Sequence, residues 1–119
     1  MSSPSRPLAV FRVKVTGRNP GPNACTVAID LDGASMAVVS ESAARTAPQA
    51  EVDGVAKALR SLPCPHDVEV RTCSTCLVSR INGQRPDSGI AFACMAGGHS
   101  VYAVYVPRDA KTMQRMNHE

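Results

Sequence analysis

The sequence is poor in aromatic residues. Its 119 residues include no Trp, two Tyr and two Phe, although 44% of them are hydrophobic. A chain of this length can bury a sizeable core in one domain without disulfides or bound metal. That core must be built from Val, Ala, Leu, Ile, Met and Cys. We therefore expect one domain over residues 9–119, preceded by a flexible tail over residues 1–8.

No apolar run is long enough to export the chain or to cross a membrane. The cysteines number five, which does not suit a complete set of disulfides. Both features predict free thiols in the reducing cytoplasm and no membrane partner.

Acidic residues are absent from the first 29 positions, which carry Arg6, Arg12, Lys14 and Arg18. The net charge of +3 is too small to establish nucleic-acid binding by itself. The basic segment either attracts phosphate or an acidic partner, or it is an edge strand protected by cations. The sequence leaves both interpretations open.

The spacing of hydrophobic residues predicts strands where they alternate with polar ones, and helices where they recur every three to four residues. The expected strands span residues 9–17, 24–31, 34–42, 67–72, 90–95 and 100–106. The expected helices span residues 47–61 and 75–81. The order is β-β-β-α-β-α followed by a C-terminal β-hairpin. A crossover helix between strands requires some parallel pairing, so the fold class is α/β with a mixed sheet.

Turn and capping residues support these boundaries. Asp-Gly at 32–33 predicts a hairpin, and Thr46 with Gln49 has the spacing of a capping box. Ser74 can cap the second helix, and Asn-Gly at 82–83 can close it in a left-handed turn.

Four short stretches, in this order, carry a resemblance to a known family. They are Asn-Pro-Gly-Pro (19–22), AEVDGVAKAL (50–59), VEVRTCSTCLVSRINGQ (68–84) and VYAVYVPRDA (101–110). With the order of elements, they make residues 9–118 similar to the ribonuclease H family. The resemblance implies a ribonuclease H-like fold.

The resemblance also implies where the catalytic acids should be. Family members cut the RNA strand of RNA–DNA hybrids with two divalent metals, held by four acids. Only Glu51 matches; Cys73 replaces one Asp, Val13 or Thr16 stands on the first strand, and the last acid would fall beyond the C-terminal Asn-His-Glu. Two Mg²⁺ ions need several carboxylates between them. We therefore expect no metal, no cofactor and no hydrolysis, with Glu51 a relic that stabilises its helix through the helix dipole.

The alternative is a reduced ribonuclease that uses Mg²⁺ or Mn²⁺. Its metal ligands would be Glu51 together with Asp109 or Glu119. In the other interpretation, Asp109 and Glu119 are solvated acids on the surface.

The loop at 18–23 is the candidate nucleic-acid contact. As in the family's loop, Arg18, Asn19, Gly21 and Asn23 would approach a phosphate or a 2′-hydroxyl. The other interpretation is a rigid turn.

The C-terminal hairpin is the candidate protein contact. Ile90, Phe92, Tyr102 and Tyr105 would line a sheet edge that binds a protein partner or a second copy. Otherwise residues 90–95 simply close the sheet beneath a helix.

Cys73 and Cys76 form a Cys-x-x-Cys motif that has three interpretations. It is a redox pair at a helix N-terminus, part of a zinc site, or two thiols that pack without reacting. The further zinc ligands would come from Cys64, His66, Cys94 and His99.

The sequence as a whole predicts a catalytically inactive ribonuclease H-like domain. It would bind a protein partner, or an RNA–DNA hybrid or structured nucleic acid, and would suit an accessory protein of a phage or mobile element.

Overall fold

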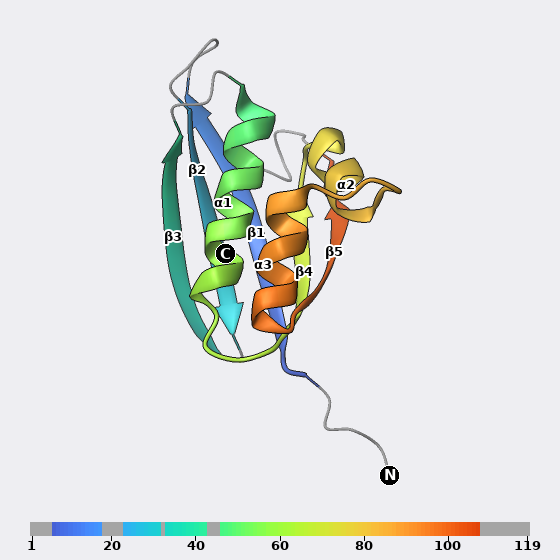
Figure 1. Ribbon diagram of the computed structural model, residues 1–119. Coiled ribbons are helices and arrows are strands. Elements are labelled where there is room, and N and C mark those ends of the chain that lie inside the picture. The colour runs from blue at the N-terminus through green and yellow to red at the C-terminus, as the bar shows by residue number, and fades with distance from the viewer. Residues whose placement is uncertain (1–5, 18–22, 32, 43–45, 108–119) are drawn as a thin grey trace.

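Five strands form one mixed sheet in the order β3-β2-β1-β4-β5 (Figure 1). The computed structural model describes residues 6–17, 23–31, 33–42 and 46–107. An antiparallel meander is made by β1 (Leu8–Gly17), β2 (Asn23–Leu31) and β3 (Ala34–Ser42). On the other side of β1, the strands β4 (Asp67–Thr72) and β5 (Ser100–Tyr105) run parallel to it.

Three helices cover one face of this sheet (Figure 1). They are α1 (Ala47–Ser61), α2 (Thr75–Asn82) and α3 (Ser88–Gly97). The core lies between the helices and the sheet, and its largest fully buried side chains are Phe11, Ile29, Leu59, Leu77 and Ile90. Apart from Phe11, these are aliphatic side chains, as the scarcity of aromatics predicts. In the described ranges, no helix is long and apolar enough to cross a membrane.

On the other face of the sheet, charged side chains pair with one another. These ion pairs are Arg6 with Asp67, Arg12 with Asp30, and Arg71 with Glu69. Arg12 and Ser35 hold the pKa of Asp30 below its ordinary value through hydrogen bonds. The cations of the N-terminal segment that contact acids here are therefore partly neutralised within the chain.

The predicted fold class is confirmed, and most predicted elements form within one residue of their expected ends. Thr46 caps α1, because its hydroxyl accepts a hydrogen bond from the Gln49 backbone at 3.4 Å. Ser74 caps α2 in the same way, accepting from the Leu77 backbone at 3.1 Å. The left-handed turn expected at Gly83 is wrong, since its φ is −73°.

The expected strand over residues 90–95 is wrong, because this segment lies within α3. The Asp87 carboxylate caps the helix by accepting from the Ile90 backbone at 3.1 Å. Gly98, with φ of 72°, ends it in the left-handed conformation that glycine adopts readily. The C-terminal hairpin is therefore absent from the described residues, and β5 closes the sheet alone.

Candidate functional site

Glu51 lies on the sheet-facing side of α1 and is only 6% exposed. Its carboxylate accepts hydrogen bonds from the hydroxyls of Thr72, the last residue of β4, and Ser74, the cap of α2. Glu51 is the fifth residue of α1, beyond the first turn, where the helix dipole acts most strongly. The expected dipole role is therefore wrong, because what holds this side chain is its pair of hydroxyl partners.

The two hydroxyls are themselves fixed by backbone amides. The Thr72 hydroxyl accepts from the Ser74 backbone at 3.0 Å, and the Ser74 hydroxyl accepts from the Leu77 backbone at 3.1 Å. Each hydroxyl then has its hydrogen free to donate to Glu51. The carboxylate therefore joins α1 to the β4–α2 junction as a structural contact.

Burial raises the pKa of Glu51, and the hydroxyls of Ser74 and Thr72 lower it by less. No other carboxylate is among the causes of this shift. A cluster of metal-binding acids without its metal would raise the pKa by repulsion between like charges. Among the described residues, Glu51 thus has the electrostatics of a buried acid with no second carboxylate beside it.

The register of the sheet indicates which first-strand residue lies on the side of Glu51. The pairing of β1 with β4 ends at Arg12 and Arg71, so Val13 and Thr72 are the residues that directly follow the last pair. Val13 packs against the core, whereas Thr16 is exposed. Because side chains alternate between faces, Thr16 points to the opposite face. The first-strand position of the site is therefore apolar.

Cys73 lies between Thr72 and Ser74 and is half-buried. Cys76, the second residue of α2, is half-buried rather than part of its buried face, and accepts a hydrogen bond from Arg80 Nε at 3.5 Å. Within the described ranges, no three His, Cys, Asp or Glu residues are grouped so as to hold a metal ion. The zinc interpretation of the Cys-x-x-Cys motif is therefore wrong for this part of the chain.

The histidines proposed as zinc ligands serve the fold instead. The His66 backbone donates to His99 Nδ1 at 3.1 Å, and His66 Nδ1 donates to the Cys64 carbonyl at 2.6 Å. A backbone hydrogen bond also links His99 to Leu59 at the end of α1. Burial, and then the charge of His66, lower the pKa of His99, in keeping with a neutral imidazole that joins α1 to the start of β4.

Most of the predicted nucleic-acid contacts lie outside the described residues: Arg18, Asn19 and Gly21. The same holds for Asp109 and Glu119, the acids of the alternative ribonuclease. Asn23 is described; it begins β2 and is 6% exposed. The role of this loop stays a prediction.

The four predicted edge residues do not lie on one surface. Ile90 is buried in the core, and Phe92 is 73% exposed on α3. Tyr102 lies on the open face of the sheet and donates to Glu69 at 2.9 Å. Tyr105, three residues along β5, points to the helix-covered side. The structure thus separates a set that the sequence had grouped on one strand pair.

Asn82 protects the β5 edge, a role that no sequence pattern indicated. Its side-chain nitrogen donates to the Ala103 carbonyl at 2.8 Å, and its side-chain oxygen accepts from the Ala103 amide at 2.9 Å. The amide group thereby pairs with the edge as a neighbouring strand would. This edge is closed at its centre.

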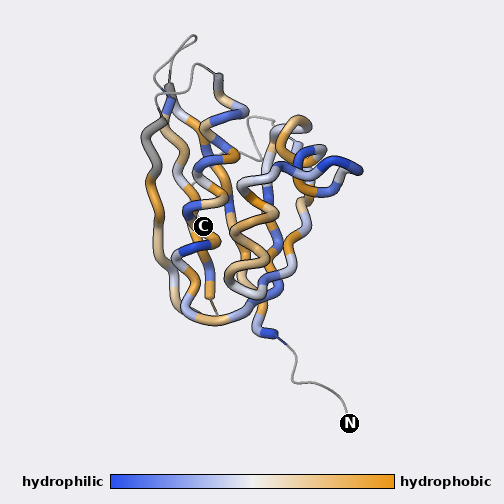
Figure 2. Tube along the Cα trace, viewed as in Figure 1, coloured by the Kyte–Doolittle hydropathy of each residue, from blue (hydrophilic) through white to orange (hydrophobic). Residues whose placement is uncertain are grey.

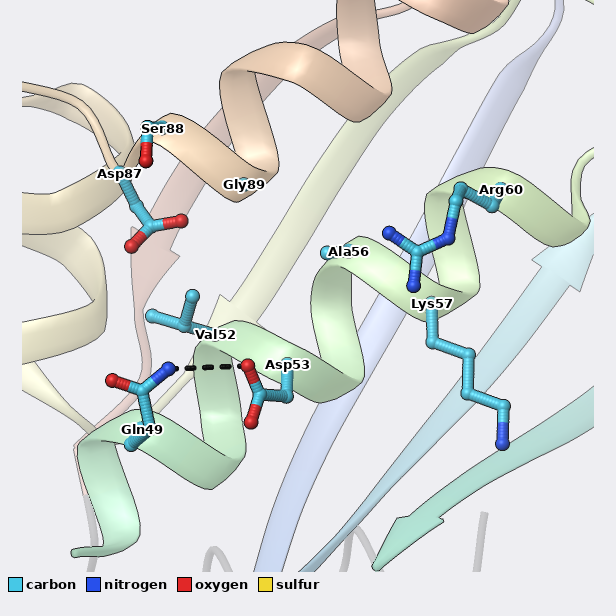
Figure 3. Close-up of a pocket in the computed structure, with 9 residues that line it drawn as sticks. All are labelled: Gln49, Val52, Asp53, Ala56, Lys57, Arg60, Asp87, Ser88 and Gly89. Atoms are coloured by element: carbon cyan, nitrogen blue, oxygen red, sulfur yellow. Dashed lines mark hydrogen bonds between the residues drawn. The ribbon is translucent and has the colours of Figure 1, made fainter. Parts of the chain in front are cut away.

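An open pocket of about 490 Å³ lies between α1 and the start of α3 (Figure 3). Its lining carries charges of both signs, and Asp87 there already caps α3. Glu51 does not line it, because the pocket lies on the side of α1 that carries Asp53 and Lys57. The full lining is Gln49, Val52, Asp53, Ala56, Lys57, Arg60, Asp87, Ser88 and Gly89. This pocket is separate from the site predicted by the resemblance.

The raised pKa of Glu51 predicts a pH-dependent difference between the wild type and Glu51→Gln. The buried carboxyl is favoured in its neutral form, so its contribution to stability is complete below the ordinary value of 4.5 and is lost as pH rises through the folded-state pKa. We expect the free energy of unfolding of Glu51→Gln to increase relative to wild type from about pH 4 to pH 7. Urea unfolding at each pH measures this difference, and the opposite slope would contradict the burial argument.

Glu51→Ala is the companion variant. It leaves the buried hydroxyls of Thr72 and Ser74 without their acceptor, so we expect it to lose about 1–3 kcal/mol near pH 4 and less as pH rises.

Comparison with known proteins supports the fold. No family model and no curated protein matches the sequence. Among solved structures, the chain is similar to the N-terminal RNase H domain of rv2228c from Mycobacterium tuberculosis, solved as a fusion with maltose binding protein. The TM-score is 0.65 at 19% identity, over 88% of this chain and 91% of that one. It is also similar to RNase H1 from the halophilic archaeon Halobacterium salinarum NRC-1, with a TM-score of 0.58 at 20% identity, over 91% of this chain and 90% of that one. The chain therefore has a ribonuclease H-like fold.

Proposed function

We propose that this chain is a ribonuclease H-like domain that does not hydrolyse RNA and acts as a binding module. The observation that carries the proposal is the surroundings of Glu51. Its carboxylate is buried and occupied by two hydroxyls, and its neighbours at the other acid positions are Val13 and Cys73. A metal pair would lack most of its ligands there.

The requirement for carboxylates follows from the chemistry of the ions. Mg²⁺ takes oxygen ligands in near-octahedral geometry, and two ions close together need anionic side chains that neutralise and bridge them. Asp53 cannot join Glu51, because two residues of helix rotate its side chain by about 200°. One buried carboxylate is therefore too little charge for the family's mechanism.

A protein is the first candidate target. The helix α3 has no charged residue, yet Phe92 and Met95 are 73% and 81% exposed. A helix that is apolar all round is usually covered. A protein partner that buries these two side chains supplies that cover.

An RNA–DNA hybrid or structured nucleic acid is the second candidate target. The observation that favours it is the basic N-terminal segment, which has no acid before Asp30 and an exposed Lys14. The neighbours of similar fold, named as RNase H proteins, agree with this class of target.

A cleavage assay tests the loss of hydrolysis. We expect the wild type to leave an RNA–DNA hybrid uncut with either Mg²⁺ or Mn²⁺, at the level of the Glu51→Gln control. Metal-dependent cutting that disappears in Glu51→Gln would overturn the proposal and establish the reduced ribonuclease, with its metal cofactor.

Salt dependence separates the two targets. Phosphate contacts make affinity fall steeply as salt rises, because bound cations are released from the nucleic acid. If a protein is the target, hybrid binding should be absent even at low salt. Tight low-salt binding with a steep salt slope would favour nucleic acid instead.

A further inference from the structure

Within the described ranges, no strand lies on the outer edge of β3, which leaves room there for a further strand. β3 is nine residues long and has β2 as its neighbour in the sheet, at the end opposite β5. Asn82 pairs with both backbone groups of Ala103 on β5. From the part of the chain that the structure describes, one lysine side chain donates to the β3 edge. The Lys57 ammonium donates to the Val39 carbonyl at 3.0 Å.

This lysine contact shows which backbone groups point outward. The Val39 carbonyl accepts from a helix side chain, so it faces away from β2. In an antiparallel pair, successive residues alternate between facing the neighbour and facing out. Ser35, Ala37 and Glu41 therefore also present their amides and carbonyls to the open side.

The middle of the strand is apolar and exposed. Val39 is 53% exposed and Met36 is 42% exposed, and Ala37 between them is also exposed. Figure 2 shows this outer strand in hydrophobic colours over its central part. Edges of this kind are normally protected by lysine, proline or a bulge. β3 has neither lysine nor proline, and it pairs with β2 without a break in register.

We propose that β3 pairs antiparallel with β3 of a second copy, about a two-fold axis at Val38. In this register Ala37 faces Val39 of the second copy, and Val38 faces its own equivalent. Apolar residues thus meet apolar ones at the centre of the contact. The contact is isologous, so it closes as a dimer and doubles the five-stranded sheet.

The second copy is favoured as the occupant because the strand is complementary to itself. In the proposed register, each outward amide of β3 lies opposite a carbonyl of the second copy. The hydrogen bond from Lys57 to the Val39 carbonyl would break when the strands pair. The inference goes beyond the proposed function, because it involves neither Glu51 nor a nucleic acid.

Two double variants test the pairing by placing charges at positions 37 and 39, which face each other across the two copies. In the Ala37→Lys, Val39→Lys variant, the charges that face each other have the same sign. In the Ala37→Lys, Val39→Glu variant, they have opposite signs. Like charges across a strand pair are destabilising and opposite charges stabilising. By sedimentation velocity over a concentration series, we expect a dimer for wild type and the Lys/Glu variant. We expect the dissociation constant of the Lys/Lys variant to be higher by roughly tenfold or more.

A wild type that stays monomeric at every concentration would overturn the proposal, and so would equal dimerisation of the two variants. Circular dichroism of both variants checks that they fold. Neither outcome bears on hydrolysis, so this inference and the proposed function fail separately.

Cross-linking tests the register itself. Residues that face each other between the hydrogen-bonded positions have Cα atoms about 4.5 Å apart, within the range of a disulfide. In a Cys64→Ser background, Val38→Cys should therefore form an oxidised dimer across the axis. Val39→Cys should not form this cross-link. In this register Val39 faces Ala37 of the second copy, so the Cα atoms of the two residues at position 39 lie more than about 7 Å apart. Equal cross-linking of both variants would contradict this register.

Discussion

Replacing Val13 and Cys73 with aspartate is expected to create a divalent-metal site around Glu51. Val13 and Thr72 directly follow the last residue pair of β1 and β4, and Cys73 comes after Thr72. Glu51 accepts a hydrogen bond from Thr72. The double variant thus collects three carboxylates around one residue. Hard cations bind such oxygen clusters with an affinity set by ligand charge. We expect Mn²⁺ to bind with a dissociation constant of about 10⁻⁴ M or lower.

Electron paramagnetic resonance of free Mn²⁺ measures this binding directly. The matched control is Thr16→Asp with Cys73→Asp, which adds the same charge. Thr16 is exposed on the opposite face of the sheet, so this variant should bind no more Mn²⁺ than Cys73→Asp alone. Equal binding by the two double variants would show that the register does not define the site.

Mn²⁺ should also stabilise the Val13→Asp, Cys73→Asp variant. Its crowded carboxylates repel one another without metal, so we expect its melting temperature to rise with Mn²⁺ concentration while that of wild type stays constant.

Gly54→Ala is expected to destabilise the protein by about 1–3 kcal/mol. A β-carbon at Gly54 would lie 2.6 Å from Cys25 Sγ and 2.9 Å from Cys25 Cβ, closer than such contacts allow. Alanine favours a helix over glycine by about 1 kcal/mol, and we expect the clash to outweigh this gain. Gly54 therefore sets how closely α1 approaches β2, and with it the depth at which Glu51 is buried.

A double-mutant cycle with Cys25→Ala isolates the clash. Removing the sulfur eliminates the shorter contact, so part of the loss should be recovered in the double variant. Burial, with smaller effects of Glu51 and Asp53, raises the pKa of Cys25 to about 12, so thiol chemistry does not disturb the comparison. Urea unfolding gives each free energy, and a Gly54→Ala variant as stable as wild type would contradict the close approach.

The N-terminal meander was predictable because its signals are local. Alternation along β1 and the Asp-Gly turn at 32–33 depend on neighbouring residues, and so do the caps at Thr46 and Ser74. The α3 segment was not, because a short apolar run fits a buried strand as well as a helix. What decides it is the cap at Asp87 and the packing of Ile90 against the core.

The candidate site was predictable only in part. The resemblance identifies Glu51 and Cys73, but it leaves Val13 and Thr16 as alternatives on the first strand. The pairing of β1 with β4 resolves them, and that pairing joins residues far apart in the sequence. The hydroxyl partners of Glu51 and the closure of the β5 edge by Asn82 likewise arise from tertiary contacts.

Diffraction from wild-type crystals soaked in Mn²⁺ tests the central claim most directly, because the anomalous signal locates each bound ion. We predict no anomalous peak at the Glu51 carboxylate, which stays hydrogen-bonded to Thr72 and Ser74. Two peaks about 4 Å apart, bridged by Glu51, would contradict the account.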